Sequence, residues 1–302
     1  MKDLVIIGSG PGGMSAAIYA IRSGMDFVIL EKGASGGQIL STSDVENYPG
    51  FIEPVAGFEL ADKMHDQCKR LGAEFKNSEA LGIKKENGVF KIETTDGILE
   101  SKTVIAVTGS SNRKLSVPGE AEFTGRGVSY CATCDGAFYR GKTVAAVGGG
   151  NAALEEAIFL TRFAEKVYLI HRRDKFRADH IVIERVKSNP KIEIIYDSVI
   201  EKINGAEKVT SASILNKKTE SRSELKLDGV FIFIGYNPNN KILPKEILNE
   251  WGEAEVDMNM QTSIEGLFAA GDIRSGSKKQ ILMACADGAT AAMSAYEYLS
   301  SL

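Results

Sequence analysis

Two cysteines, Cys131 and Cys134, are separated by two residues, and an acid, Asp135, follows them directly. A C-x-x-C pair can close an intramolecular disulfide, and this arrangement lowers the pKa of a thiol. We interpret the pair as a redox-active dithiol, with two inert structural thiols as the alternative. Asp135 is a candidate proton donor or acceptor for this dithiol, and the alternative for it is an ordinary turn carboxylate.

Zinc is the other chemistry that a C-x-x-C pair can serve, and it needs four ligands. The remaining cysteines and histidines are Cys68, Cys285, His65, His171 and His180. None of them forms a second pair at ligand spacing, so the sequence argues against a metal site. We expect Cys68 and Cys285 to be core residues, because both fall in apolar stretches.

A glycine-rich segment near the start of the chain, Gly8-Ser9-Gly10-Pro11-Gly12-Gly13, follows a short apolar run and precedes a helical pattern. Glycines let the backbone approach a pyrophosphate, and the helix N-terminus offers unpaired N–H groups. Glu31 lies 23 residues after Gly8, where a carboxylate can accept the hydroxyls of a ribose and would repel a 2′-phosphate. The segment therefore predicts FAD or NAD, and the alternative is a tight turn without a ligand.

A second glycine-rich segment, Gly148-Gly149-Gly150-Asn151-Ala152, repeats this plan fourteen residues after Cys134. The same count of 23 residues from Gly148 reaches His171, which is followed by Arg172 and Arg173, and Arg177 comes soon after. Guanidinium groups bind phosphate in a bidentate manner, so this segment predicts NADPH. The alternative is a solvated basic turn that balances Glu165 and Asp174. The candidate NADPH contacts are Gly148, Gly150, Asn151, Ala152, His171, Arg172, Arg173 and Arg177.

The composition sets limits on the class of protein. A chain of 302 residues with 43% apolar and 25% charged residues is typical of a globular protein large enough for two domains. The net charge of −4 gives no reason to expect nucleic acid or an anionic membrane as a partner. The N-terminus does not resemble a signal peptide, and no apolar run approaches the roughly 20 residues of a membrane span. We therefore expect a cytoplasmic protein, in which a disulfide is usually catalytic or redox-sensing.

The elements that must position these residues occur twice. Residues 3–31 and 142–171 each read as strand, glycine-rich turn, helix and strand. Turn dipeptides follow in each half and predict short hairpins. These dipeptides are Asn87-Gly88 and Asp96-Gly97 in the first half, and Asn204-Gly205 and Asp228-Gly229 in the second. The helix of the second half is predicted to cover residues 152–164.

The fold class that follows is α/β, with two Rossmann-like three-layer nucleotide-binding domains, the second inserted in the first. A buried strand with Gly271-Asp272 at its end and a final helix near 284–299 complete the first domain. We predict a discontinuous FAD-binding domain over 1–114 plus 244–302. We predict an NADPH-binding domain, which carries the dithiol, over 115–243.

These motifs together identify a resemblance: over essentially its whole length, the chain resembles low-molecular-weight thioredoxin reductases. The segments that carry it are Gly8–Gly13, Gly36-Gly37-Gln38, Val45–Gly50, Cys131–Asp135, Gly148–Ala153 with Glu155-Glu156-Ala157, His171–Arg173 with Arg177, and Gly271-Asp272. The chain departs from the family at Asn151-Ala152, where Asp-Ser is usual, and at Lys279-Gln280, where Arg-Gln is usual.

The resemblance implies a homodimer that binds FAD and NADPH and reduces the disulfide of thioredoxin or a thioredoxin-like protein. It implies FAD contacts at Gly8, Gly10, Pro11, Gly13, Glu31, Gly37, Gln38, Asn47, Gly271, Asp272, Lys279 and Gln280. It also implies a last helix whose N-terminus points at the flavin. Cys134 is the candidate for the flavin-facing sulfur, because it neighbours Asp135.

Three alternatives stay open at this point. The same flavin–dithiol core could take electrons from ferredoxin, or it could run in reverse as a thiol oxidase. The chain could also be a redox sensor without catalysis. In the leading hypothesis the dithiol must meet the flavin and then a protein substrate, which predicts a large rotation of the second domain about two connections.

Overall fold

The computed structural model describes residues 1–42 and 45–302, which fall into two compact units. Unit 1 comprises Met1–Thr42, Tyr48–Ser111 and Asn237–Leu302, and unit 2 comprises the described residues 45–47 together with Asn112–Tyr236. Unit 2 is thus inserted in unit 1, as the sequence predicted for the fold class. The domain borders predicted from the sequence are 114/115 and 243/244, whereas the two units divide at 111/112 and 236/237.

Unit 1 is built on a seven-stranded sheet in the order β3-β2-β1-β6-β5-β4, with β17 also paired to β6. Its strands are β1 (Lys2–Ile7), β2 (Phe27–Glu31), β3 (Phe75–Asn77), β4 (Ala80–Glu86), β5 (Val89–Thr94), β6 (Gly97–Ala106) and β17 (Leu267–Ala269). β3, β2, β1, β6 and β17 are parallel, whereas β4 and β5 are antiparallel extensions of β6. The central segments of the parallel sheet, Leu4–Ile7 of β1, Phe27–Leu30 of β2 and Val104–Ala106 of β6, are buried apolar runs, because both faces of the sheet are covered there.

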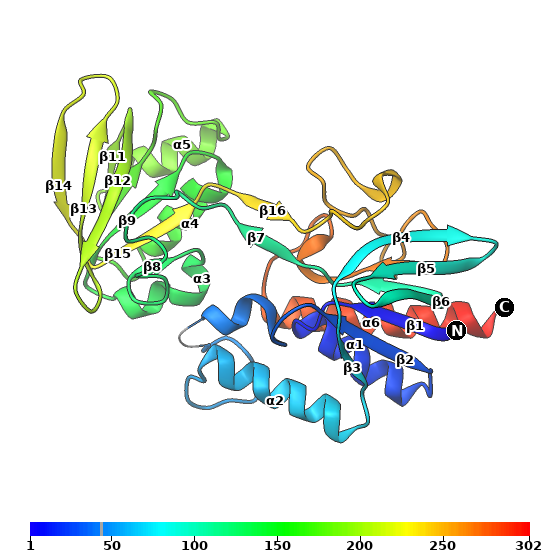
Figure 1. Cartoon of the computed structure of the whole chain (residues 1–302). Coiled ribbons are helices and arrows are strands. Elements are labelled where there is room, and N and C mark those ends of the chain that lie inside the picture. Colours follow the sequence, from blue (N-terminus) through cyan, green and yellow to red (C-terminus); the bar gives the residue numbers. More distant parts are fainter. Residues whose placement is uncertain (43–44) are drawn as a thin grey trace. The chain divides into compact units, whose positions relative to one another are not determined.

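The helices of unit 1 are α1 (Pro11–Arg22), η1 (Gly37–Ser41), α2 (Gly57–Arg70), η3 (Lys245–Ile247), η4 (Gly271–Ile273) and α6 (Ile281–Ser300). α1 and α6 lie side by side (Figure 1) and approach closely because small residues line their contact. A Cβ atom on Gly288 would overlap the carbonyl oxygen of Gly12. The two helices therefore hold the first glycine-rich turn and the N-terminal half of α6 in one rigid block.

Unit 2 has a five-stranded parallel sheet in the order β11-β10-β9-β15-β8 and a three-stranded antiparallel sheet in the order β12-β13-β14. The strands are β8 (Val128–Ser129), β9 (Thr143–Gly148), β10 (Lys166–Ile170), β11 (Ile192–Ile195), β12 (Ser198–Gly205), β13 (Val209–Asn216), β14 (Arg222–Lys226) and β15 (Gly229–Phe233). The helices are α3 (Ala132–Asp135), η2 (Gly136–Tyr139), α4 (Asn151–Leu160) and α5 (His180–Lys187).

The three layers of unit 2 follow from the alternation of side chains along β9. Val144 and Ala146 belong to a buried cluster with residues of α4 and α5, whereas Ala145 and Val147 belong to a cluster with residues of β12 and β13. The parallel sheet is therefore covered by helices on one face and by the antiparallel sheet on the other. The two connections between the units, β7 (Ser110–Asn112) and β16 (Tyr236–Pro238), pair with each other as a two-stranded ribbon.

Some local predictions were wrong. Asn87-Gly88 does form a hairpin turn, with both residues at positive φ. Asn204-Gly205, however, ends β12 beside a register shift, and Asp228-Gly229 leads from β14 into β15, which lies in a different sheet. The helix predicted over 152–164 ends at Leu160, because Thr161, Arg162 and Phe163 bond to carbonyls three residues back instead of four.

Among the described residues, no helix combines the length and the apolar character that crossing a membrane would require.

Candidate redox and nucleotide sites

Cys131 and Cys134 form a disulfide at the start of α3, directly after β8 of the parallel sheet in unit 2. Cys131 is the N-cap residue of α3, and the backbone N–H of Cys134 donates to the Cys131 Sγ at 3.1 Å. A sulfur at an N-cap receives N–H groups that would otherwise lack a partner, and this stabilises negative charge on it. After reduction of the disulfide, the geometry favours a thiolate on Cys131.

Ser129 links this disulfide to Asp135. Its hydroxyl donates to Asp135 Oδ2 at 2.5 Å and accepts the backbone N–H of Cys131 at 3.1 Å. The Ser129 hydroxyl thus bridges the Asp135 carboxylate and the backbone N–H of Cys131 through two hydrogen bonds. Burial raises the pKa of Tyr139 to about 12, and the charges of Asp135 and Asp228 contribute, so this phenol stays protonated. Ser129 is not predictable from the sequence, because a single serine two residues before a cysteine has no distinctive spacing.

The first glycine-rich turn excludes side chains at Gly8 and Gly13 and leaves open space beside Gly10. Gly8 has a φ of 108°, and a Cβ there would overlap the carbonyl oxygen of Val107. A Cβ on Gly13 would overlap the carbonyl oxygen of Gly8. Gly10 is the N-cap of α1 and supplies no capping side chain, and a Cβ on it would meet only the oxygen of Gly36, at 4.0 Å. The first N–H groups of α1 are thus offered to an anion, which fits a pyrophosphate.

Glu31 ends β2 beside this turn, and both of its carboxylate oxygens are held by donors from nearby loops. Oε2 accepts the backbone N–H and the hydroxyl of Ser9, each at 2.9 Å. Oε1 accepts the N–H groups of Lys32 at 2.9 Å and Gly33 at 3.1 Å. The negative charge of this residue is therefore fixed next to the turn, as a nucleotide ribose would require and a 2′-phosphate would not tolerate.

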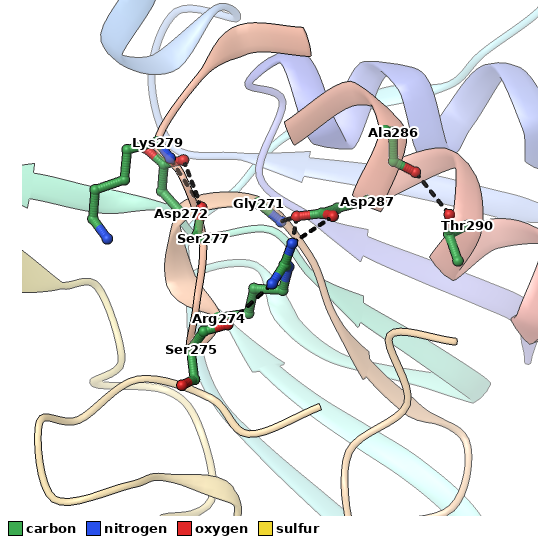
Figure 2. A network of polar contacts seen from close by, with 9 residues as sticks. All are labelled: Gly271, Asp272, Arg274, Ser275, Ser277, Lys279, Ala286, Asp287 and Thr290. Atoms are coloured by element: carbon green, nitrogen blue, oxygen red, sulfur yellow. Dashed lines mark hydrogen bonds and ion pairs between the residues drawn. The ribbon is translucent and has the colours of Figure 1, made fainter. Parts of the chain in front are cut away.

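Asp272 lies in the short helix η4 after β17, and two polar side chains contact it. Gln38 Nε2 donates to one carboxylate oxygen at 3.3 Å and the Ser277 hydroxyl to the other at 3.4 Å. Burial raises the pKa of Asp272, against the lowering effect of Lys279 and Ser277. Figure 2 shows Ser277 between Asp272 and the backbone of Lys279, whose N–H donates to the Ser277 hydroxyl at 3.3 Å. Two of the predicted FAD residues, Gln38 and Asp272, are thus brought together from positions 234 residues apart.

A buried ion pair fixes the same loop to α6. Arg274 binds Asp287 through Nε at 2.7 Å and Nη2 at 2.9 Å, and the backbone N–H of Gly271 donates to Asp287 Oδ2 at 3.2 Å (Figure 2). The exposed fractions of the two side chains are 20% for Arg274 and 9% for Asp287. Sequence reasoning missed this pair, although a single acid within the small apolar run of α6 could have signalled it.

The other predicted FAD residues take these positions. Pro11 is the first residue of α1, Gly37 opens η1 at a φ of 60°, and Gln280 is the N-cap of α6. Lys279 has a φ of 53°, and its ammonium lies 3.9 Å from Glu253. Asn47 is exposed and is grouped with unit 2.

The two cysteines outside the disulfide differ. Cys68 is fully buried in α2, as predicted, whereas Cys285 in α6 is partly exposed and its thiol lies 3.7 Å from the carbonyl oxygen of Pro11. Burial raises the pKa of both thiols to about 11, so neither is a thiolate at neutral pH. In the part of the chain that the structure describes, no three His, Cys, Asp or Glu side chains are placed to hold a metal ion.

The second glycine-rich turn has the same construction as the first. Gly148 has a φ of 158°, and Gly150 is the N-cap of α4 without a capping side chain. The nearest heavy atom to a Cβ on Gly150 would be the Arg177 oxygen at 3.9 Å. Asn151 and Ala152, the first two residues of α4, are exposed. The turn again offers backbone N–H groups in an open position, which fits the pyrophosphate of a second nucleotide.

His171 and the three arginines are placed differently. The His171 ring is buried beneath the turn, where a Cβ on Gly149 would overlap it, and its Nε2 lies 3.0 Å from the Lys175 oxygen. Burial lowers the pKa of this imidazole, so it is neutral at pH 7. Arg172 and Arg177 are exposed and Arg173 is partly exposed. Among the described residues, no carboxylate forms an ion pair with these three guanidinium groups, which leaves them available to a phosphate.

Comparisons with known proteins agree with this construction. The family model described as pyridine nucleotide-disulphide oxidoreductase matches residues 2–288. The chain is 46% identical to the thioredoxin reductase of Helicobacter pylori, with 99% of each chain aligned, and 43% identical to that of Treponema pallidum, with 99% and 98% aligned. It is similar to the crystal structure of thioredoxin reductase from Streptococcus pyogenes, at 45% identity, a TM-score of 0.96, and coverage of 100% and 99%. The chain therefore belongs to the pyridine nucleotide-disulphide oxidoreductase family.

Proposed function

We propose that this protein is a thioredoxin-disulfide reductase that takes electrons from NADPH and passes them through FAD to the Cys131–Cys134 disulfide. The observation that carries the proposal is the position of this disulfide. It follows β8 in the same unit as a nucleotide turn with three available guanidinium groups, while the other unit holds a turn flanked by a carboxylate. Full-length similarity to thioredoxin reductases supports the same assignment.

FAD belongs to unit 1 in this proposal. When bound, it would supply a carrier that accepts a hydride from a nicotinamide and delivers two electrons to a disulfide. The residues proposed to hold it are Gly8, Gly10, Pro11, Gly13, Glu31, Gly37, Gln38, Asn47, Gly271, Asp272, Lys279 and Gln280. Among them, Gly10 leaves the N-terminus of α1 open to the pyrophosphate, and Gly13 lets α1 pack closely on the turn. Glu31 accepts the ribose hydroxyls, and Asp272 provides a partly buried acceptor next to Gln38.

NADPH belongs to unit 2. Gly148, Gly150, Asn151 and Ala152 would present the pyrophosphate with the N-terminus of α4, and Arg172, Arg173 and Arg177 would bind the 2′-phosphate. We assign His171 a supporting role, because its ring is buried under Gly149 instead of facing solvent. A domain division near 1–114 plus 244–302 and 115–243 is part of the same proposal.

The dithiol acts on the partner by thiol–disulfide exchange. We assign the attack on the partner's disulfide to Cys131, because the Cys134 N–H stabilises a thiolate there. Cys134 then displaces the partner as a dithiol and restores the Cys131–Cys134 bond, which leaves Cys134 as the flavin-facing sulfur. Asp135, held by Ser129, takes up or returns the proton of this exchange. The partner is thioredoxin or a thioredoxin-like protein, and the assembly we propose is a cytoplasmic homodimer with rotating NADPH-binding domains.

The proposal is tested by assay of the purified holoenzyme. With NADPH, a thioredoxin and a chromogenic disulfide, we expect turnover that requires all three components. A Cys131→Ser, Cys134→Ser double variant should bind FAD normally and show no turnover. Bleaching of the flavin by reduced ferredoxin but not by millimolar NADPH would contradict the proposed donor. NADPH oxidation that does not depend on thioredoxin would contradict the proposed acceptor.

A further inference from the structure

Asp179 lies at a helix N-cap position, but its side chain does not cap the helix. It is the N-cap residue of α5, with extended backbone angles of φ −63° and ψ 141°. Aspartate at this position usually accepts an N–H from the first turn of its own helix, which stabilises the helix. In this chain the carboxylate makes no such capping bond. A residue type suited to capping is therefore used for another contact.

That contact is Asn151, at the start of α4. The Asn151 amide donates from Nδ2 to Asp179 Oδ2 at 3.0 Å, and Asn151 Oδ1 accepts the backbone N–H of Asp179 at 2.7 Å. The two residues thus bind each other reciprocally across 28 positions of sequence. Both are exposed, so the pair lies at the surface next to the second glycine-rich turn and not in the core.

The backbone on either side of this pair is joined as well. The N–H of Arg177 donates to the Gly149 oxygen at 2.7 Å, and Gly150 and Arg177 form a parallel bridge. Beneath them, His171 packs under Gly149 and bonds the Lys175 oxygen. Residues 149–151 and 177–179 therefore run together as a short ladder, and the Asn151–Asp179 pair closes its outer end.

The ladder joins the proposed site for the pyrophosphate of NADPH to the proposed site for its 2′-phosphate. Residues 148–152 form the proposed pyrophosphate site, and Arg177 belongs to the proposed 2′-phosphate site. The carboxylate of Asp179 lies two residues from Arg177, where a free negative charge would repel a 2′-phosphate. The amide of Asn151 donates to this carboxylate and draws it toward the turn. The pair thus has a mechanical effect and an electrostatic effect on the same phosphate.

From this geometry we infer that Asn151 and Asp179 are positioning residues that set the preference for NADPH over NADH. They hold the arginine loop at a fixed place relative to the pyrophosphate turn, and they keep the Asp179 charge away from the 2′-phosphate. The inference rests on the proposed function, and it adds Asp179, which contacts no coenzyme in our assignment. It also gives the side chain of Asn151 a role, at a position where Asp is usual in the family.

The test compares kcat/KM for NADPH and NADH in stopped-flow reduction of the flavin by the holoenzyme. Asn151→Ala should lower the NADPH:NADH ratio about tenfold, equivalent to about 1.4 kcal/mol. The loss should fall on KM for NADPH, with kcat nearly unchanged, because the pair does not touch the reacting atoms. Asp179→Ala removes the same contact but also removes the charge that would repel a 2′-phosphate, so it should lower the ratio by a smaller factor than Asn151→Ala. Because position 179 is exposed, this variant covers the case in which Asn151→Ala folds poorly.

The decisive variant exchanges the two side chains. In Asn151→Asp, Asp179→Asn the new carboxylate can accept both the backbone N–H of residue 179 and the new amide. Both hydrogen bonds therefore return, the bond between the side chains with donor and acceptor exchanged, and the net charge is unchanged. A carboxylate at position 151 affects both coenzymes, so the ratio is the readout, and we expect it to recover most of its wild-type value. Asn204→Ala, which removes an amide bonded to Ser211 and Ser213, is the matched control and should leave the ratio unchanged.

The outcomes separate this inference from the proposed function. Wild-type protein whose flavin is not reduced by NADPH overturns both. Wild-type protein that prefers NADPH, with Asn151→Ala and Asp179→Ala keeping the full preference, overturns the inference alone. A ratio that falls equally in Asn204→Ala, or that stays low in the exchanged variant, shows a general loss of stability and also overturns it.

Discussion

The ion pair between Arg274 and Asp287 gives the sharpest stability prediction. Asp287→Asn keeps the size of the side chain and leaves the Arg274 guanidinium, which is 20% exposed, without its counter-charge. Removal of one partner from a buried pair costs about 3–5 kcal/mol, and we expect the lower end because Arg274 is not fully buried. Unit 1 is of a size at which 1 kcal/mol shifts the melting temperature by about 2–4 °C. A loss of about 3 kcal/mol therefore predicts a decrease of roughly 6–12 °C.

The assay is thermal unfolding of the FAD-loaded protein, followed by the rise in flavin fluorescence as FAD is released. The matched control is Glu201→Gln, which breaks the pair with Arg222, a guanidinium–carboxylate contact with two hydrogen bonds at 2.9 Å and 3.1 Å. Because the Arg222 side chain is 69% exposed, this substitution should leave the melting temperature almost unchanged.

A double substitution separates stability from cofactor binding. Replacing the pair by Arg274→Met and Asp287→Leu should recover most of the stability, since apolar residues can replace a buried ion pair. It cannot restore the acceptor for the Gly271 N–H, so FAD affinity should stay reduced. If Asp287→Asn melts like the wild type and retains FAD, the pair does not fix the loop that carries Asp272, and our reasoning about this loop is wrong.

The remaining predictions concern unit 2. In the part of the chain that the structure describes, one buried carboxylate oxygen of Glu156 has no hydrogen-bond partner. Burial raises the pKa of Glu156 above the ordinary value of 4.5, and the charge of Glu155 contributes. The charged form of Glu156 is thus disfavoured in the folded protein, so Glu156→Gln should raise the melting temperature at pH 7. This gain should vanish as the pH falls below 4.5, where the carboxyl is protonated in both the folded and the unfolded protein. A gain in melting temperature that persists in acid would contradict this. Cys134→Ser should trap a mixed disulfide between Cys131 and thioredoxin, visible on a non-reducing gel, and trapping only by Cys131→Ser would reverse our assignment. Gly149→Ala should weaken NADPH binding and lower stability by about 1–3 kcal/mol, because a methyl group there displaces the buried His171 ring; unchanged affinity would show that this ring can move freely.

The fold class was predictable because its signals are local. Parallel strands covered on both faces must be apolar throughout, and the runs that begin at Leu4 and Val144 have this property. The glycines at 8 and 148 mark the turns because their backbone conformation and close contacts exclude side chains. The confirmed family and the disulfide depend on the same short-range patterns.

The predictions that failed, and the contacts that were missed, depend on partners distant in sequence. Asn204-Gly205 has the composition of a hairpin turn, yet the register shift in β12 moves the turn beyond it. Nothing near Asp179 reveals that its carboxylate leaves its own helix for Asn151. Spacing alone placed His171 among the candidate NADPH contacts, and it does not reveal the tertiary packing that puts the ring under Gly149.

In the proposed function, NADPH reduces the Cys131–Cys134 disulfide through the bound flavin. The most direct measurement is anaerobic treatment of the FAD-loaded protein with NADPH, followed by alkylation and mass spectrometry of the peptide that contains both cysteines. We predict two alkyl groups on this peptide after NADPH and none before it, and no alkylation when the protein has been stripped of FAD. A peptide that stays disulfide-bonded while NADPH reduces the flavin would contradict the account.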